Sequence, residues 1–188
     1  MTYAGIDQSI NSTGICILDN GQEYFYIIKP APKTNKEKLV ESAITNFEYC
    51  IYPHDNISTY KTNSEREIAK TNNILRISNV VQQILAKHNV DYVCMEGISY
   101  GSRTSSLCDL AGLNYILRST IGLYNLYIAT PSEVKKYWTG IGNCNKSLMI
   151  EQFVESRPLF SSLPKNDDIA DACAMAYLCK EKYDMSKL

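Results

Sequence analysis

The stretch of sequence that decides the fold is residues 2–29, which read TYAGIDQSINSTGICILDNGQEYFYIIK. Three β-prone runs, at 2–7, 13–18 and 23–29, alternate here with short polar segments. The last two runs are separated by a segment that contains Asn20-Gly21, a dipeptide that strongly favours a tight hairpin turn. The sequence therefore predicts an antiparallel meander of three strands at the start of the chain.

After the meander, helical and strand-like patterns alternate along the chain. Strands are expected at 90–95 and 126–129, and helices at 64–87, 102–122, 131–138, 146–154 and 166–182. Strands that alternate with helices are typical of parallel pairing through right-handed crossovers. The predicted fold class is α/β, with a mixed five-stranded sheet (the antiparallel three-strand meander plus two parallel strands) flanked by helices.

The chain is short enough for one compact domain. Its 188 residues, of which 45% are hydrophobic and 21% charged, predict a single folded domain at 1–188 and exclude global disorder. The stretch 30–63 is interrupted by prolines, and its pattern supports only one helix, at 36–47. The formal net charge of −1 gives no overall field that attracts nucleic acid, so any phosphate-binding surface must be a local patch.

The cysteines and the N-terminus indicate the cellular compartment of the protein. Seven cysteines are an odd number, and none falls in a C-x-x-C spacing, which argues for a reducing compartment and against structural zinc. No run approaches the roughly 18 to 20 apolar residues that cross a bilayer, and the first residues do not resemble a signal peptide. We therefore expect a cytoplasmic protein without a membrane partner.

Carboxylates in unusual places are the main chemical signal. Asp7 and Glu96 each end an apolar strand, where a lone buried charge is costly unless a cation compensates it. Asp168 and Asp171, three residues apart, project from one face of the last helix. If the four converge, their repulsion calls for divalent cations, and hard carboxylate oxygens suit Mg²⁺ or Mn²⁺.

Two alternatives to this interpretation remain open at the level of sequence. Acids in the first turn of a helix stabilise its dipole, so Asp167 and Asp168 taken alone fit that structural role, and Asp7 alone fits a turn cap. Asp167 also lies four residues from Asp171 on the same side of the helix, and spacing does not decide between Asp167 and Asp168 as the ligand.

Four segments, in order, resemble the RuvC-type Holliday junction resolvases, the crossover junction endodeoxyribonucleases of the RNase H-like superfamily. GIDQSINSTG at 5–14 resembles the family's opening G-I-D-x-x-x-x-x-T-G, and VCME at 93–96 resembles its second acidic strand. PSEVKK at 131–136 with GIGNCNKS at 140–147 is similar to its basic V-K segment and G-I-G-x-x-x-K-S loop. DIADA at 168–172 resembles its closing helix. An excess of Asn, Ile, Lys and Tyr suits a phage or viral member with an A·T-rich genome.

The resemblance implies an RNase H-like fold, a two-fold symmetric homodimer, and Mg²⁺-dependent paired nicking of four-way DNA junctions with two ions in each active site. It implies that the catalytic and metal-binding residues are Asp7, Glu96, Asp168 and Asp171. Lys146 would offset phosphate charge beside the metals. The DNA-binding residues expected from the basic segments and from the loop after the second acid are Lys135, Lys136, Lys146, Arg103 and Tyr100.

The chain also departs from the family pattern. Ser99 stands where the family commonly has a bulky residue that enters the junction centre, and Tyr100 beside it could take that role. The stretch 30–63 is longer than the usual connection, which indicates an insertion, at the dimer interface or at a DNA-facing edge. A broader nuclease for branched DNA and a non-catalytic junction-binding dimer are therefore alternatives. An actin-like ATPase or sugar kinase, which the first hairpin also resembles, would need a second lobe that 188 residues lack.

Overall fold

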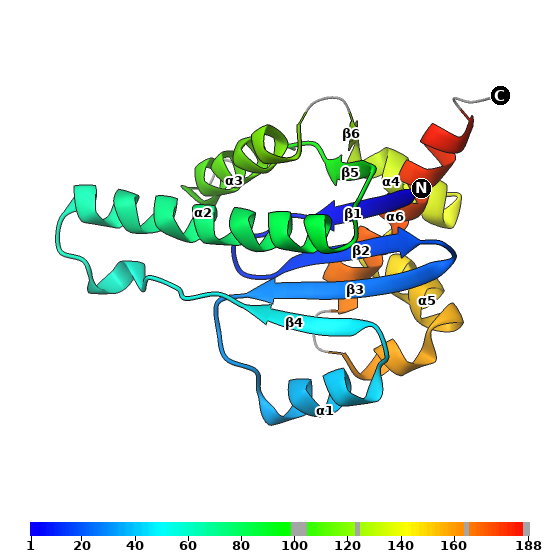
Figure 1. Cartoon of the computed structure of the whole chain (residues 1–188), viewed down its shortest axis with the longest axis horizontal. Helices are drawn as coiled ribbons and strands as arrows, with labels where there is room; N and C mark the ends of the chain where they lie inside the picture. Colours follow the sequence, from blue (N-terminus) through cyan, green and yellow to red (C-terminus); the bar gives the residue numbers. More distant parts are fainter. Residues whose placement is uncertain (99–104, 123–124, 164–165, 186–188) are drawn as a thin grey trace.

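A computed structural model of the chain describes residues 1–98, 105–122, 125–163 and 166–185. Its centre is one mixed sheet with the strand order β4-β3-β2-β1-β5-β6 (Figure 1). The strands are β1 (Thr2–Asp7), β2 (Thr13–Asp19), β3 (Gln22–Lys29), β4 (Phe47–Ile51), β5 (Tyr92–Glu96) and β6 (Leu126–Ala129). The first three pair antiparallel, and β4, β5 and β6 each pair parallel to a neighbour.

The predicted α/β architecture and the three-strand meander are confirmed, but the strand number was wrong. The sheet has six strands because α1 (Asn35–Ala43) ends earlier than the helix predicted at 36–47, and Phe47–Ile51 then forms β4 beside β3. Asn46, with a φ of 63°, makes the sharp turn between the helix and the strand. β4 has only five residues, too few for its alternation of buried and exposed side chains to stand out in the sequence.

The β2–β3 turn has the conformation that its sequence predicts. Asn20 and Gly21 both have positive φ angles, 47° and 83°. Two successive positive φ values are what a type I′ hairpin turn requires, and this turn matches the right-handed twist of the flanking strands. The Asn-Gly pair therefore fixes the register of the meander on which the rest of the sheet is built.

Helices cover both faces of the sheet. On one face lie α2 (Asn63–Lys87) and α3 (Ser105–Ile121), and on the other lie α4 (Pro131–Thr139), α5 (Lys146–Ser156) and α6 (Asn166–Met185) (Figure 1). Two 3₁₀ turns, η1 (Ile57–Thr59) and η2 (Pro158–Ser162), complete the described elements. Among the described residues, no helix has the length and apolarity to span a bilayer.

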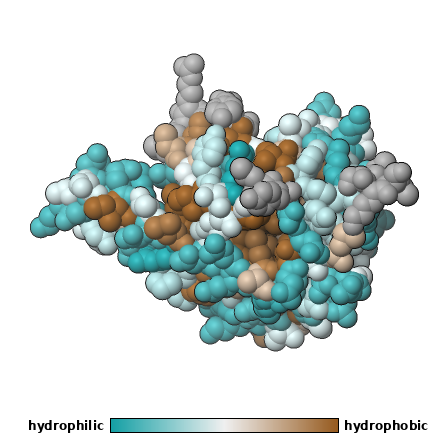
Figure 2. All heavy atoms as spheres, turned by 45° about the horizontal axis from the view of Figure 1, so that its top comes forward, coloured by the Kyte–Doolittle hydropathy of each residue, from teal (hydrophilic) through white to brown (hydrophobic). Residues whose placement is uncertain are grey.

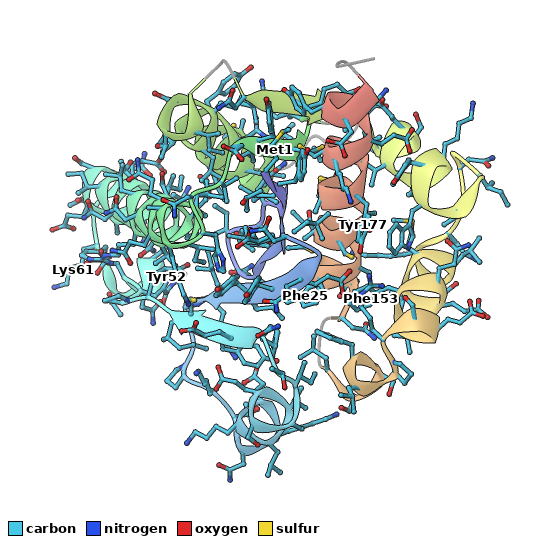
Figure 3. The ribbon with its side chains drawn as sticks, turned by 45° about the vertical axis from the view of Figure 1, so that its right-hand side comes forward. Met1, Phe25, Tyr52, Lys61, Phe153 and Tyr177 are labelled. Carbon is cyan, nitrogen blue, oxygen red and sulfur yellow. The ribbon has the colours of Figure 1, made fainter. Side chains whose placement is uncertain are left out.

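Alternation of side chains along the strands separates two cores. In β1, Ala4 and Ile6 face α2 and α3, whereas Tyr3 faces α6. The α6 side is the more aromatic: the rings of Phe25 on β3 and Phe153 on α5 meet edge to face, 5.9 Å apart (Figure 3). With both faces buried, the central strands are apolar throughout, so that an acid at a strand end stands out.

Candidate active site

Asp7 and Glu96 lie at the ends of neighbouring parallel strands. β1 and β5 pair in a register that places Ile6 beside Met95, so the next residue of each strand is the acid. Tyr3 on β1 and Cys94 on β5 face α6, and the side chains two or four residues further along point to the same face. The fold therefore brings both carboxylates to the face of the sheet that α6 covers, at the carboxyl ends of β1 and β5.

Two glycines, in β1 and β2, let α6 approach the sheet closely. A Cβ atom on Gly5 would lie 2.0 Å from the main-chain oxygen of Ala172, and one on Gly14 would lie 2.3 Å from the main-chain oxygen of Asp168. No side chain fits at either position unless the helix backbone moves. The glycines of the G-I-D and T-G segments thus set the distance between the strands and the acidic start of α6.

The acids of α6 influence those of the sheet electrostatically. Burial raises the pKa of Asp7, and the charges of Asp171, Asp168 and Glu96 raise it further. Burial together with neighbouring acids, opposed by Lys146, brings the pKa of Asp171 to about 6, and burial and Asp171 also raise the pKa of Glu96. The four carboxylates predicted from the sequence therefore share one region of the structure.

Asp167 forms an ion pair with a lysine next to the predicted acids. Its carboxylate lies 2.7 Å from Nζ of Lys146, which is 3.9 Å from a carboxylate oxygen of Asp171. Burial opposes ionisation of Asp167, but the pairing with Lys146 outweighs it and lowers the pKa. Asp167 and Asp168 both raise the pKa of Asp171, and Asp168 also raises that of Asp7. The two acids differ in their partners, which are Lys146 for Asp167 and Ser12 for Asp168.

A neighbouring hydroxyl orients Asp168. The buried side chain of Ser12, in the β1–β2 loop, donates a hydrogen bond to an Asp168 carboxylate oxygen. The same loop is held by Thr13, whose hydroxyl donates to the carbonyl of Ser9 at 2.6 Å. Ser12 was not predicted as a site residue, because a serine in a polar loop carries no signal until the fold shows that it is buried.

The glycine-rich loop places Lys146. Gly140, with a φ of 77°, ends α4 in the left-handed conformation that favours glycine. Asn145 then caps α5 by accepting a hydrogen bond from the amide of Leu148 at 3.0 Å. Lys146 is consequently the first residue of α5, and its ammonium faces the acids of α6.

The other predicted DNA-binding residues fall into two groups. Lys135 turns inward: its Nζ donates to the carbonyl of Cys144 at 3.1 Å, and its charge lowers the pKa of both Glu96 and Asp171, although burial raises them. Lys136 is exposed at the end of α4, as expected of a residue that contacts a phosphate backbone. Tyr100, Arg103 and the neighbouring Ser99 lie outside the described residues.

The donor set suits a hard divalent cation. Burial and neighbouring acids raise the pKa of Asp7, Glu96 and Asp171, and Asp168 adds its charge beside them. Carboxylate oxygens are the donors that Mg²⁺ and Mn²⁺ prefer. In the part of the chain that the structure describes, no three acidic, His or Cys side chains are already arranged as a cation cage. The carboxylates are neighbours that repel one another, and their chemistry fits a cation that would draw them together.

The chain has sequence relatives in one family. Residues 54–179 match the family described as crossover junction endodeoxyribonuclease RuvC. RuvC of Rickettsia felis is 28% identical over 181 residues, which make up 95% of this chain and 97% of that protein. RuvC of Rickettsia prowazekii is 29% identical over 126 residues, 64% of this chain and 76% of that protein. Asp7 lies before residues 54–179, the range that the family model matches. The similarity to the Rickettsia felis protein covers nearly the whole chain.

Solved structures share the fold. Thermus thermophilus RuvC in complex with a Holliday junction substrate gives a TM-score of 0.57 at 18% identity, covering 98% of this chain and 94% of that chain. The yeast mitochondrial Holliday junction resolvase gives 0.53 at 15% identity, covering 98% of this chain and 82% of that chain. These likenesses confirm the RNase H-like fold. Since the family match spans well over half of its residues, the chain belongs to the RuvC family of crossover junction endodeoxyribonucleases.

Proposed function

We propose that this chain resolves four-way DNA junctions by paired, symmetric, metal-dependent hydrolysis of phosphodiester bonds. The observation that carries the proposal is the convergence of carboxylates from β1, β5 and α6 beside a lysine. Membership of the RuvC family supports it, as does the similarity to the Thermus thermophilus protein whose structure contains a Holliday junction. The broader activity on branched DNA that the sequence leaves open becomes an outcome of the test.

The acids and Ser12 have different roles in this proposal. Asp7, Glu96, Asp168 and Asp171 would hold divalent cations, Mg²⁺ or Mn²⁺, with two ions per site. When bound, such ions supply Lewis-acid activation of water and stabilisation of the departing oxygen. Ser12 holds one carboxylate oxygen of Asp168, which leaves fewer orientations open to that side chain.

The lysines would balance the charge of the DNA. The ammonium of Lys146, next to Asp171, offsets the negative charge that an incoming phosphate brings to the acids. Lys135 would act beside it, since its charge already reaches Glu96 and Asp171. Lys136 would contact the backbone further out, together with Arg103 and Tyr100 from the loop after Glu96.

Two sites on a symmetric junction call for two copies of the chain. Ile68 and Leu75 on α2 and Tyr115 on α3 are 59%, 45% and 56% exposed, which is unusual for large hydrophobic side chains on helices that also pack against the sheet. Figure 2 shows brown hydrophobic spheres among hydrophilic ones on the projecting end of the molecule that α2 forms. We assign this face of α2 and α3 to a homodimer interface. The replacement of Ile68 and Leu75 by glutamate should give a monomer in sedimentation analysis.

The domain organisation belongs to the same proposal. Residues 1–188 act as one nuclease domain, in which 30–63 is an insertion that contributes α1 and β4. Two ion pairs fasten α1 to the chain before it: Lys29 with Glu37, and Lys33 with Glu41, both at 2.6 Å. This segment widens the sheet at the edge remote from β5 and β6, away from the acids.

The test is cleavage of a labelled immobile four-way junction. Mg²⁺ is compared with Ca²⁺, and linear duplex, Y-junction and flap substrates of the same sequence are run in parallel. Paired Mg²⁺-dependent nicks confined to the four-way junction would establish a strict resolvase. Cuts in every branched form would point to the broader nuclease, and tight binding without cuts would contradict the proposed catalysis.

A further inference from the structure

The main-chain carbonyl of Glu96 is held by two side-chain amides from different parts of the fold. Nε2 of Gln8 donates to it at 3.0 Å, and Nδ2 of Asn114 donates at 3.1 Å. Gln8 follows the last residue of β1, and Asn114 lies in the middle of α3. Because β1 ends level with β5, the side chain of Gln8 reaches the carbonyl at the point where strand pairing stops.

Both amides are buried, and each leaves its own oxygen without a partner. Asn114 is 0% exposed and Gln8 is 9% exposed. Within the described residues, Oδ1 of Asn114 and Oε1 of Gln8 accept no hydrogen bond. A buried acceptor without a donor lowers stability, whereas an apolar side chain of similar shape at either position would carry no such cost. Stability alone therefore does not account for these two amides.

The position of the shared carbonyl indicates what they do. It belongs to Glu96, so a rotation of this peptide group would also turn the carboxylate. On the other side of β5, the amide of Gly97, which belongs to the same peptide group, donates to the carbonyl of Ala129 at 2.8 Å, so this peptide group is held at both its oxygen and its nitrogen. The end of β5 is thus held from β1, from α3 and from β6 at once.

We infer that Gln8 and Asn114 are positioning residues that aim the Glu96 carboxylate at the site of hydrolysis. The inference rests on the proposed function, because it assigns the pair to the same reaction. Neither amide touches the reacting atoms; both act through the backbone of Glu96. Groups that orient a metal ligand in this way typically change activity or metal affinity about ten- to a hundredfold when they are removed.

The decisive variant is Asn114→Leu, which keeps the approximate shape and removes the amide. Since Gln8 still donates to the Glu96 carbonyl and a buried unpaired oxygen is lost, the melting temperature should stay the same or rise. The kcat for junction cleavage should fall roughly tenfold or more, and the KM should change by less than about twofold. An unchanged kcat would overturn the inference, as would a kcat that falls only with the folded fraction.

A matched control separates the carbonyl contact from helix docking in general. The hydroxyls of Ser78 on α2 and Thr120 on α3 form a hydrogen bond of 3.1 Å that joins the same helix to its neighbour. The variant Ser78→Ala should lower the melting temperature and leave kcat unchanged. The pair Gln8→Met and Asn114→Leu should together lower kcat more than either change alone, because each single variant retains one donor.

A readout that does not depend on cleavage keeps the two proposals distinguishable. Hydrogen exchange of the Gly97 amide should be about tenfold faster in Asn114→Leu than in the wild type, and Mn²⁺ should bind more weakly in calorimetry without DNA. If the wild-type protein cuts no junction, the proposed function fails, yet these two measurements still show whether the amides hold Glu96. Unchanged exchange and unchanged Mn²⁺ affinity would refute the positioning role.

Discussion

The ammonium of Lys146 and the carboxylate of Asp167 form an ion pair of 2.7 Å at the start of α6. Asp168, the next residue, instead accepts a hydrogen bond from Ser12 and raises the pKa of Asp7. Two adjacent acids in the first turn of α6 thus face different partners. Asp167 pairs with the ammonium of Lys146, and Asp168 is the acid that we propose as a metal ligand.

This division predicts different outcomes for Asp167→Asn and Asp168→Asn. The first should lower kcat only a few-fold and change stability by less than about 1 kcal/mol, because a partly exposed ion pair is worth little. The second should abolish measurable Mn²⁺ binding and cleavage. Calorimetry with Mn²⁺ and single-turnover cleavage check both, and a loss of Mn²⁺ binding in Asp167→Asn but not in Asp168→Asn would reverse the assignment.

Removal of the β1 acid should separate cleavage from binding. Asp7→Asn should reduce cleavage about a thousandfold, since a metal contributes several kcal/mol and each 1.4 kcal/mol is a factor of ten. Junction affinity should be retained or increase, because one charge that repels phosphate is lost. Gel-shift titration in Ca²⁺ and cleavage in Mg²⁺ measure the two effects. The matched control, Glu151→Gln on the exposed side of α5, should change neither.

Junction binding should weaken steeply with salt, because lysines that displace counterions supply the attraction. Lys136→Ala should lower the slope of log affinity against log salt by about one. Lys180→Ala, an exposed change near the other end of α6, serves as the control and should leave the slope unaltered. An equal loss of slope in both variants would argue against a local basic patch.

The close approach of α6 should make Gly14 intolerant of any side chain. Gly14→Ala places a methyl group 2.3 Å from the main-chain oxygen of Asp168, so the helix must move. We expect a loss of about 1–3 kcal/mol in unfolding free energy together with strongly reduced cleavage. Gly112→Ala in α3, where the nearest atom would be 3.5 Å away, should be neutral or stabilising by up to about 1 kcal/mol. Urea denaturation compares the two.

Stability at mildly acidic pH should depend on His88. Burial and the nearby Lys87 lower the pKa of its imidazole, and Nε2 is hydrogen-bonded to the Tyr26 hydroxyl at 2.6 Å. The folded state therefore favours neutral His88, and this contribution is present above the ordinary pKa of about 6.5 and lost as the pH falls from there through the lower pKa of the folded state. The acids with raised pKa values act in the opposite direction, so the comparison must be made between variants.

The measurement is the melting temperature at about pH 7.5 and about pH 5.5. His88→Gln should lose less stability than the wild type on acidification. His54→Gln, at an exposed position, should follow the wild type. If His88→Gln and the wild type lose stability equally, the neutral imidazole contributes nothing to the fold.

The parts of the fold that the sequence predicted have strong local signals. The Asn20-Gly21 turn fixes the meander, and the helix that Pro131 begins starts where it was predicted. The strand at 126–129 and the helix start at 146 also match the structure. β4 was missed because its pairing with β3 is long-range and its run is short. Local propensity does not report which distant strand will cover an edge.

The site residues, like the strands, were predicted where their signal is local in the sequence and missed where it depends on distant parts of the chain. The strand-end position of Asp7 and Glu96 is visible in the sequence, and the structure brings them to one face. The different partners of Asp167 and Asp168 were not visible, since they depend on where Lys146 and Ser12 lie. Gln8 and Asn114 carried no sequence signal either, because amides are common at protein surfaces and only the fold shows that these two are buried.

The contact between Gly5 and Ala172 has a consequence for how such a chain can evolve. Main chain meets main chain there, with no side chain between β1 and α6. The separation between the strand acid and the helix acids is therefore insensitive to the size of the residues that fill either core. Substitutions in either core can therefore leave the spacing of the acids unchanged, provided that Gly5 and Gly14 remain.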